Sequence, residues 1–182
     1  MEIGKIKALI KEIEVLLDAL DTDEQEQEQE QELKTLWFKG FEYKEVMTAT
    51  GRIWLDRNLG ARRVAQAMDD ESSYGGYYSF DEVECPPGYR LPTEEEWKEE
   101  MRSWDDEDTS GAFNSSLKLP MAGLRESCSG SLFFVGSYGF YWSSTVFGSN
   151  ARRLYFYSCG ASMYSSNRAG GGSVRCIKEM GA

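Results

Sequence analysis

The sequence predicts an α+β protein with short strands, few helices and long loops, preceded by an N-terminal amphipathic helix. Apolar residues make up 41% of the 182 residues, which is enough for a core, while 18 Gly and only 4 Pro indicate many turns. Apolar runs in the last two thirds are short and are separated by Gly and Ser. The length suits a domain over residues 36–182 with an appendage over residues 1–35.

The appendage carries an apolar repeat with alternating spacings of three and four, typical of a coiled coil. Its members are Ile3, Ile6, Ile10, Ile13, Leu17 and Leu20. Isoleucine at both core positions favours three strands or more, so we expect a homotrimer through residues 3–20. A single amphipathic helix packed on its own domain explains the pattern as well. Residues 21–32, in which Gln and Glu alternate from Glu24, could continue as a solvated helix or act as a charged spacer.

One strong helix signal lies within the domain. Thr93 is a good N-cap, and Glu96 stands where it completes a capping box. Trp97 and Met101, four residues apart, would then face the core. We expect this helix to be the only well-formed one of the domain.

The other signals are for strands and turns. Residues 41–59 contain two β-prone runs that flank a turn, which predicts a hairpin. Further short apolar runs predict strands joined by loops. These runs are residues 117–120, 132–135, 140–142, 154–157 and 174–177.

The run from Arg152 to Cys159 shows which side chains share a face. Side chains alternate along a strand, so Leu154 and Phe156 lie on one face as the natural core pair. Tyr155 and Tyr157 then lie beside Arg153 on the other face, with the composition of a binding hot spot. A strand that is buried on both faces remains the alternative.

Residues 160–173 consist of Ala, Ser, Met, Tyr, Asn, Arg and Gly. This composition is typical of antibody loops, in which Tyr supplies contact area and Ser, Gly and Asn supply adaptable hydrogen bonds. A flexible linker has a similar composition. The apolar residues 174–177 that follow favour the loop, because they indicate a core strand that closes the fold.

Composition bears on function as well. The net charge of −11, without a Lys/Arg cluster, argues against nucleic acid as a partner. The absence of His excludes Ser–His and Cys–His catalysis and the usual zinc sites. The acidic run 105–108 could hold the carboxylate pair of a hydrolase, although a solvated loop explains it better. No signal peptide and no apolar stretch of membrane-spanning length is visible.

The four cysteines are Cys85, Cys128, Cys159 and Cys176, and none forms a C-x-x-C pair. Three disulfide connectivities are possible for four cysteines. Four free thiols are an equally good interpretation of the spacing alone.

Four sequence blocks together resemble the Fibrobacter succinogenes major paralogous domain. They occur in the order of that family and cover roughly residues 45–178. The blocks are Gly51–Ala61, Cys85–Thr93 with Glu96–Trp97, Tyr141–Thr145 and Ser173–Cys176.

The resemblance implies a C-type-lectin-like fold of the formylglycine-generating-enzyme type. The same fold is used by variable proteins of diversity-generating retroelements, in which residues near the C-terminus are diversified. It implies a variable region over residues 140–176 and brings Cys85 near Cys176 as a disulfide. The displayed, ligand-contacting positions would be Phe147, Ser149, Arg153, Tyr155, Tyr157, Cys159, Tyr164, Ser166, Asn167, Gly170 and Gly172.

By the same resemblance, the chain is a non-enzymatic binding protein on a virion or cell surface, such as a phage or archaeal-virus receptor-binding protein. Its ligand would be a protein or a surface glycan on a target cell. A cell-surface adhesive or structural module with fixed specificity is the alternative. The chain lacks the paired cysteines of the formylglycine-generating enzyme and the calcium-site tripeptides of sugar-binding lectins, so we expect no catalytic residue, metal or cofactor.

Overall fold

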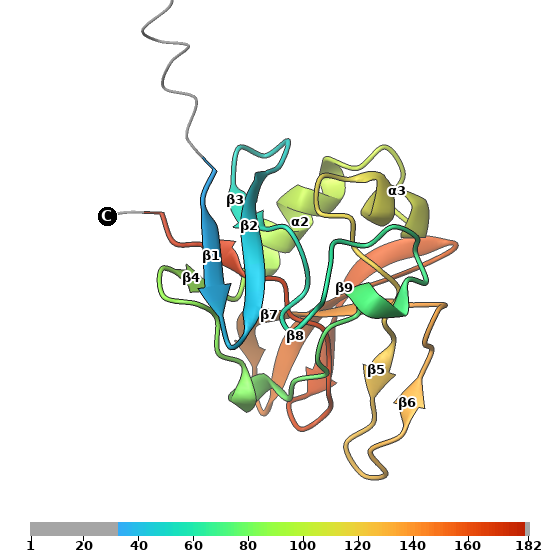
Figure 1. Ribbon diagram of the computed structural model, residues 1–182. Coiled ribbons are helices and arrows are strands. Elements are labelled where there is room, and N and C mark those ends of the chain that lie inside the picture. Colours follow the sequence, from blue (N-terminus) through green and yellow to red (C-terminus); the bar gives the residue numbers. More distant parts are fainter. Residues whose placement is uncertain (1–32, 181–182) are drawn as a thin grey trace, which may run out of the picture. The chain divides into compact units, whose positions relative to one another are not determined.

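The larger of two main sheets is antiparallel and has the strand order β1-β2-β3-β10-β4 (Figure 1). The structure is a computed structural model that describes residues 33–180, so the heptads at residues 3–20 and the charged spacer lie outside the described residues. The strands of this sheet are Thr35–Phe38 (β1), Phe41–Met47 (β2), Ile53–Leu55 (β3), Tyr89–Arg90 (β4) and Ile177–Lys178 (β10). The hairpin predicted within residues 41–59 is confirmed as β2 and β3, with Val46 opposite Trp54.

The second main sheet consists of three consecutive antiparallel strands, β7 (Gly139–Phe147), β8 (Asn150–Tyr157) and β9 (Gly160–Asn167). Its register places Tyr155 of β8 between Phe140 of β7 and Ser162 of β9. A separate hairpin of β5 (Leu124–Arg125) and β6 (Leu132–Phe133) projects beside this sheet in Figure 1.

Two sequence predictions are wrong, one for a loop and one for a strand. Residues 160–173 have the composition of a loop, but Gly160–Asn167 form β9. This strand pairs with β8 alone, and only its Ala161 and Met163 pack against the first core. A Ser-rich edge strand therefore suffices. Residues 117–120 form no strand although Leu117 and Leu119 are buried, because Lys118 adopts a left-handed φ of 48° that a strand cannot contain.

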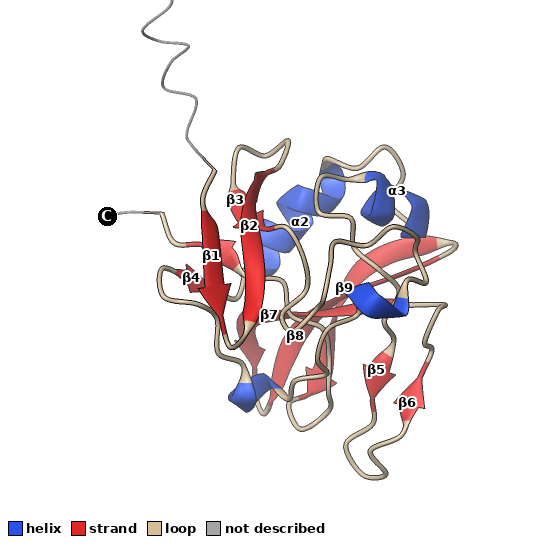
Figure 2. Cartoon of the chain, in the orientation of Figure 1, coloured by secondary structure: helices blue, strands red, loops and turns tan. Residues whose placement is uncertain are grey.

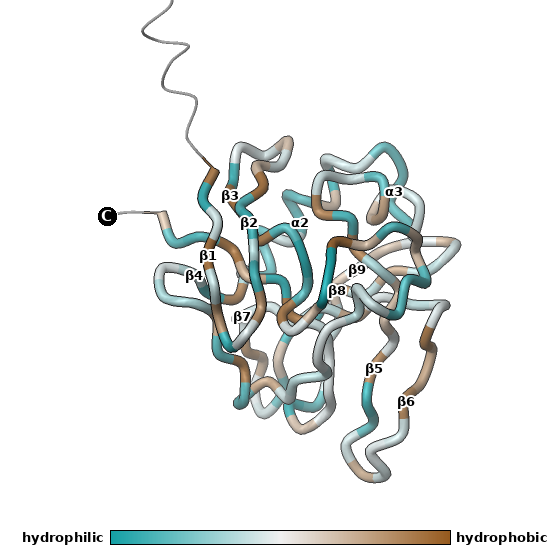
Figure 3. The backbone as a smooth tube through the Cα atoms, in the orientation of Figure 1, coloured by the Kyte–Doolittle hydropathy of each residue, from teal (hydrophilic) through white to brown (hydrophobic). Residues whose placement is uncertain are grey.

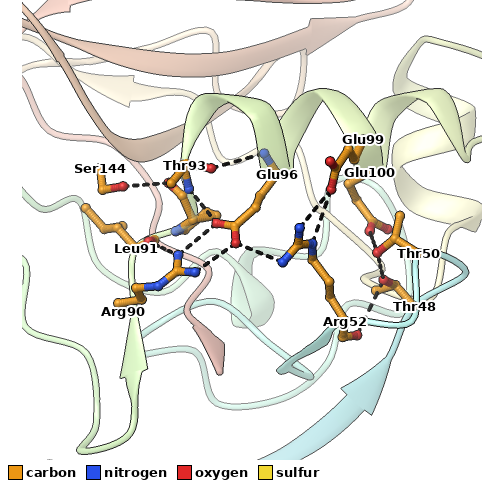
Figure 4. Close-up of polar contacts among 11 residues, drawn as sticks. Thr48, Thr50, Arg52, Arg90, Leu91, Thr93, Glu96, Glu99, Glu100 and Ser144 are labelled. Atoms are coloured by element: carbon orange, nitrogen blue, oxygen red, sulfur yellow. Dashed lines mark hydrogen bonds and ion pairs between the residues drawn. The ribbon is translucent and has the colours of Figure 1, made fainter. Parts of the chain in front are cut away.

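Helix α2 (Glu94–Arg102) begins at the predicted cap. The Thr93 hydroxyl accepts the backbone N–H of Glu96 at 3.2 Å, and the Glu96 carboxylate accepts the backbone N–H of Thr93 at 2.7 Å (Figure 4). Both bonds satisfy donors that the first turn of a helix otherwise leaves free. Trp97 and Met101 are buried, as predicted.

A second helix, α3 (Thr109–Asn114), makes the expectation of a single helix wrong (Figure 2). The acidic run that precedes it supplies the cap: the Asp108 carboxylate accepts the backbone N–H groups of Ser110 at 2.7 Å and Gly111 at 3.2 Å. Two short 3₁₀ helices, Glu71–Ser73 and Phe80–Glu82, complete the helical elements of residues 33–180.

The β7-β8-β9 sheet lies between two apolar cores. Leu154 and Phe156 on its inner face pack with Trp97 and Trp104, from α2 and the turn after it, in the first core. The other face contributes Trp142 and Ala151 to a second core, whose remaining buried members are Tyr43, Leu55, Leu59, Val174 and Cys176. Only part of that second face is covered, and the remainder forms the site described below.

A disulfide joins Cys85, before β4, to Cys176, before β10, as the resemblance implies. The two residues are separated by 91 positions in sequence. Cys128 and Cys159 are free and exposed. The disulfide therefore fixes the C-terminal segment. The predicted core run 174–177 also holds this segment, because all four of its residues are buried. Only Ile177 of this run belongs to a strand, β10.

Antiparallel sheets with two α-helices and long loops over residues 33–180 confirm the predicted α+β class. Among the described residues, no helix has both the length and the apolar character needed to cross a membrane.

Candidate functional site: an aromatic face on the three-stranded sheet

The alternation along β8 separates core residues from displayed residues. Leu154 and Phe156 are fully buried, while Tyr155 and Tyr157 are half-buried on the opposite face. Tyr164 of β9, opposite Arg153, joins the two tyrosines on that face. The alternative of a strand buried on both faces is therefore wrong for the part of β8 that carries Tyr155 and Tyr157.

We call the group of partly exposed rings on this side the aromatic face: Phe134, Tyr138, Tyr155, Tyr157 and Tyr164. The ring centroids of Tyr138 and Tyr157 lie 5.1 Å apart, and those of Tyr155 and Tyr164 lie 5.2 Å apart. Phe134 and Tyr138 are 4.9 Å apart, and buried Phe140 lies beneath them at 6.1 and 5.8 Å. The rings thus form one continuous surface over three strands and the β6–β7 connection.

The rings of Tyr138, Tyr155 and Tyr157 are held in nearly parallel planes, whereas the ring of Tyr164 is nearly perpendicular to that of Tyr155. The planes of Tyr138 and Tyr157 differ by 11°, and those of Tyr155 and Tyr157 by 6°. Parallel neighbours cover part of one another's ring faces. Mutual packing also restricts the rotamers before any ligand arrives, which lowers the entropic cost of binding.

The aromatic face is uncharged on a strongly acidic chain. Residues 127–167 contain no Asp, Glu or Lys, and their only charged residues are Arg152 and Arg153. Arg152 points to the inner side, where its guanidinium pairs with Glu94 of α2 at 2.7 and 2.8 Å. The members of the aromatic face therefore offer apolar contact and neutral hydrogen bonds.

Arg153 is not a displayed residue, and that prediction is wrong. Its side chain is 1% exposed and lies over the Trp142 ring, with 3.6 Å between the guanidinium carbon and the ring centroid. Burial lowers the pKa of Arg153 to about 10, an effect that neighbouring Tyr164 opposes. The sequence alternation placed Arg153 on the correct face, but that end of the face is covered by the segment carrying Gly170.

Gly172 is also buried, contrary to the prediction. It exchanges two backbone hydrogen bonds with Tyr78, at 2.9 and 3.0 Å, and a Cβ atom on Gly172 would lie 3.1 Å from Cζ of Arg153. A glycine is needed here because the 170–172 segment crosses closely over the Arg153 side chain. Gly170 is half-buried at the border of the covered region.

The other predicted positions fall into separate places. Phe147, which is 69% exposed, and Ser149 lie at the β7–β8 turn, and exposed Asn167 pairs with Asn150 beside them. Cys159 is exposed in the β8–β9 turn, at the opposite end of the sheet. Ser166 is half-buried near the first end. Only Tyr155, Tyr157 and Tyr164 lie within the aromatic face.

Sequence reasoning missed Phe134 and Tyr138, which lie before the expected variable region. The strand predicted for residues 132–135 is present over Leu132–Phe133 (β6), but all four residues are between 39% and 52% exposed, and Figure 3 shows this apolar segment along the projecting hairpin. The signal that could have found them is Gly136, which ends the apolar run before β7 begins at Gly139.

No family model, curated protein or solved structure matches this chain.

Proposed function

We propose that the chain is a ligand-binding variable protein of a diversity-generating retroelement, built on a C-type lectin fold and displayed on a virion or cell surface. The observation that carries this proposal is the alternation along β8: Leu154 and Phe156 are buried, while Tyr155 and Tyr157 are half-buried on the opposite face. A backbone that is fixed from beneath can present many different side chains without loss of the fold.

The chemistry of the aromatic face supports a macromolecular ligand. Tyr and Ser supply contact area and adaptable hydrogen bonds in antibody combining sites, and Tyr155, Tyr157, Ser162 and Tyr164 lie together here. The uncharged stretch 127–151 predicts that binding changes little with ionic strength. A trimer through residues 3–20 would add avidity by presenting three such faces together.

Sequencing of sister copies of the gene tests the proposal. The exposed and half-buried positions should vary, while buried Arg153 and Gly172 should not. A reverse transcriptase gene and an invariant near-copy of the 3′ segment should lie nearby. Substitutions spread evenly over buried and exposed positions would contradict the proposal. The positions expected to vary are Phe147, Ser149, Tyr155, Tyr157, Cys159, Tyr164, Ser166, Asn167 and Gly170.

An adhesive module with fixed specificity is the second candidate. The exposed apolar run 132–135 favours this second candidate, because it lies outside residues 140–176 and would therefore stay constant among sister copies. A gene without a neighbouring reverse transcriptase, and with identical residues at positions 155, 157 and 164 in all copies, would support this candidate instead.

A further inference from the structure

A pocket of about 440 Å³ opens at the border of the aromatic face. Five separate segments line it, and Ser158 follows directly after Tyr157 of the aromatic face. Gly136 and Ser137 similarly precede Tyr138. The lining residues are Met68, Asp108, Thr109, Ser110, Met121, Gly136, Ser137 and Ser158.

The backbone around this pocket is fixed. Met121 donates its backbone N–H to Met68 at 2.7 Å, and Gly136 donates to Met121 at 2.8 Å, so three walls are joined by hydrogen bonds. Gly136 has a φ of 71°, which a glycine adopts without strain. The pocket thus exists before a ligand binds, as most small binding sites do.

The lining combines two thioethers with hydroxyl groups. Met68 and Met121 are half-buried and supply polarizable apolar surface, which favours contact with aromatic rings. Thr109 is 5% exposed, and its hydroxyl has no hydrogen-bond partner within residues 33–180. Neighbouring atoms cover this hydroxyl, so it costs the fold stability and is not itself a contact for a ligand.

The one carboxylate of the pocket is already engaged. Asp108 accepts hydrogen bonds from Ser110 and Gly111 at the start of α3, and the contact with Ser110 holds the pKa of Asp108 below its usual range. Its charge is therefore directed into its own helix cap, and the remaining lining is neutral.

We infer that this pocket receives an aromatic side chain of a protein ligand, anchoring the ligand beside the aromatic face. The inference rests on the proposed binding function and adds a fixed contact to it, because seven of the eight lining residues precede the expected variable region 140–176. Whatever side chains the variable positions carry, the pocket would then bind an aromatic side chain of the ligand at the same place. A glycan is disfavoured, because the exposed lining of the pocket is more apolar than polar and the two thioethers offer sugar hydroxyls no strong partner.

Methyl NMR of the full chain, labelled at the methionine methyl groups, tests this inference with N-acetyl-L-phenylalaninamide as the probe. Saturable shifts of the Met68 and Met121 methyl signals are expected, whereas methyl β-glucoside should leave them unchanged. Shifts with the glucoside alone, or with neither compound, would overturn the inference.

A blocking variant supplies the control. Ser137 is exposed at the rim and its side chain makes no hydrogen bond within the described residues, so Ser137→Trp should fill the pocket and weaken the probe by about tenfold or more. Ser131→Trp, at an exposed position that does not line the pocket, should leave probe affinity unchanged. Equal affinity in both variants would contradict the assignment. Failure of the probe to bind would overturn the pocket assignment but not the proposed function, which the sequencing of sister copies tests separately.

Discussion

The guanidinium carbon of Arg153 lies 3.6 Å from the centre of the Trp142 ring, beneath the 170–172 segment. This stacked pair marks where the outer face of the β7-β8-β9 sheet stops being available to a ligand. Arg153 has one hydrogen bond, to the Gly170 carbonyl at 3.4 Å, and its Nε has no partner within the described part of the chain. Its place is therefore held by packing more than by charge.

This geometry makes a prediction for position 153. Arg153→Ser removes the stacked side chain and should cost about 2–4 kcal/mol of unfolding free energy. Arg153→Met keeps the apolar volume without a buried charge and should stay within about 1 kcal/mol of the parent. Urea denaturation measures both variants. If Arg153→Ser left the unfolding free energy unchanged but abolished ligand binding, Arg153 would be a displayed residue instead.

Gly170 and Gly172 form a matched pair for alanine substitution. Gly172→Ala places a Cβ atom 3.1 Å from Cζ of Arg153 and should destabilise by about 1–2 kcal/mol. Gly170→Ala, with its nearest neighbour the Asn167 carbonyl oxygen at 3.4 Å, should be almost neutral. Thermal unfolding of the two variants compares them directly, and equal losses would contradict the difference in burial.

The disulfide should make stability sensitive to reduction. Cys85 and Cys176 close a loop of 91 residues, and removal of such a link typically costs about 2–5 kcal/mol. The double variant Cys85→Ala/Cys176→Ala should lower the denaturation midpoint, and a reductant should have no further effect on it. The double variant Cys128→Ala/Cys159→Ala is the control, since both thiols are free and exposed. Its stability should equal that of the parent.

Glu96 predicts a loss of stability in acid. Burial alone would raise the pKa of Glu96, but hydrogen bonds from Arg90 and the Thr93 backbone lower it to about 2, and the charge of Arg52 assists (Figure 4). The carboxylate therefore stabilises the fold above its unfolded pKa, and this contribution disappears as the pH falls from about 4.5 towards 2. The loss should reach up to about 3 kcal/mol. Glu96→Gln should flatten the pH dependence of the unfolding free energy in this window.

Glu100, one helical turn further along α2, has the opposite behaviour. Burial raises the pKa of Glu100, which accepts a hydrogen bond from the Thr50 hydroxyl at 3.4 Å and is 1% exposed. The fold favours its protonated form, so its contribution weakens as the pH rises through the raised pKa. Glu100→Gln should consequently stabilise the protein at neutral pH, by about 1 kcal/mol. A lower melting temperature of that variant at pH 7 would contradict this account.

The sequence predicted those features that depend on local patterns. The capping box of Thr93 and Glu96 requires residues three positions apart, and the faces of β8 follow from alternation alone. Both are therefore visible without coordinates. Burial set by distant segments is not visible in this way. The covering of Arg153 depends on a glycine segment about 17 residues later, and no local pattern reports it.

The aromatic face was predicted in part for the same reason. Tyr155 and Tyr157 belong to one strand, but Phe134 and Tyr138 reach them from the β6–β7 connection through contacts between chain segments. The burial of Arg175 is a similar case. It donates hydrogen bonds to Asn58 and to the Leu117 carbonyl, residues 117 and 58 positions away. A charged residue in a predicted core strand gives no indication of such partners.

The central claim is that the tyrosines of the aromatic face are displayed on a backbone held from the opposite side. The triple variant Tyr155→Ser/Tyr157→Ser/Tyr164→Ser tests it most directly, by urea denaturation beside Leu154→Ala. The triple variant should remain folded with an unchanged dependence on urea and should lose no more stability than Leu154→Ala alone, which should cost about 2–5 kcal/mol. Unfolding of the triple variant, with Leu154→Ala close to the parent, would contradict the claim.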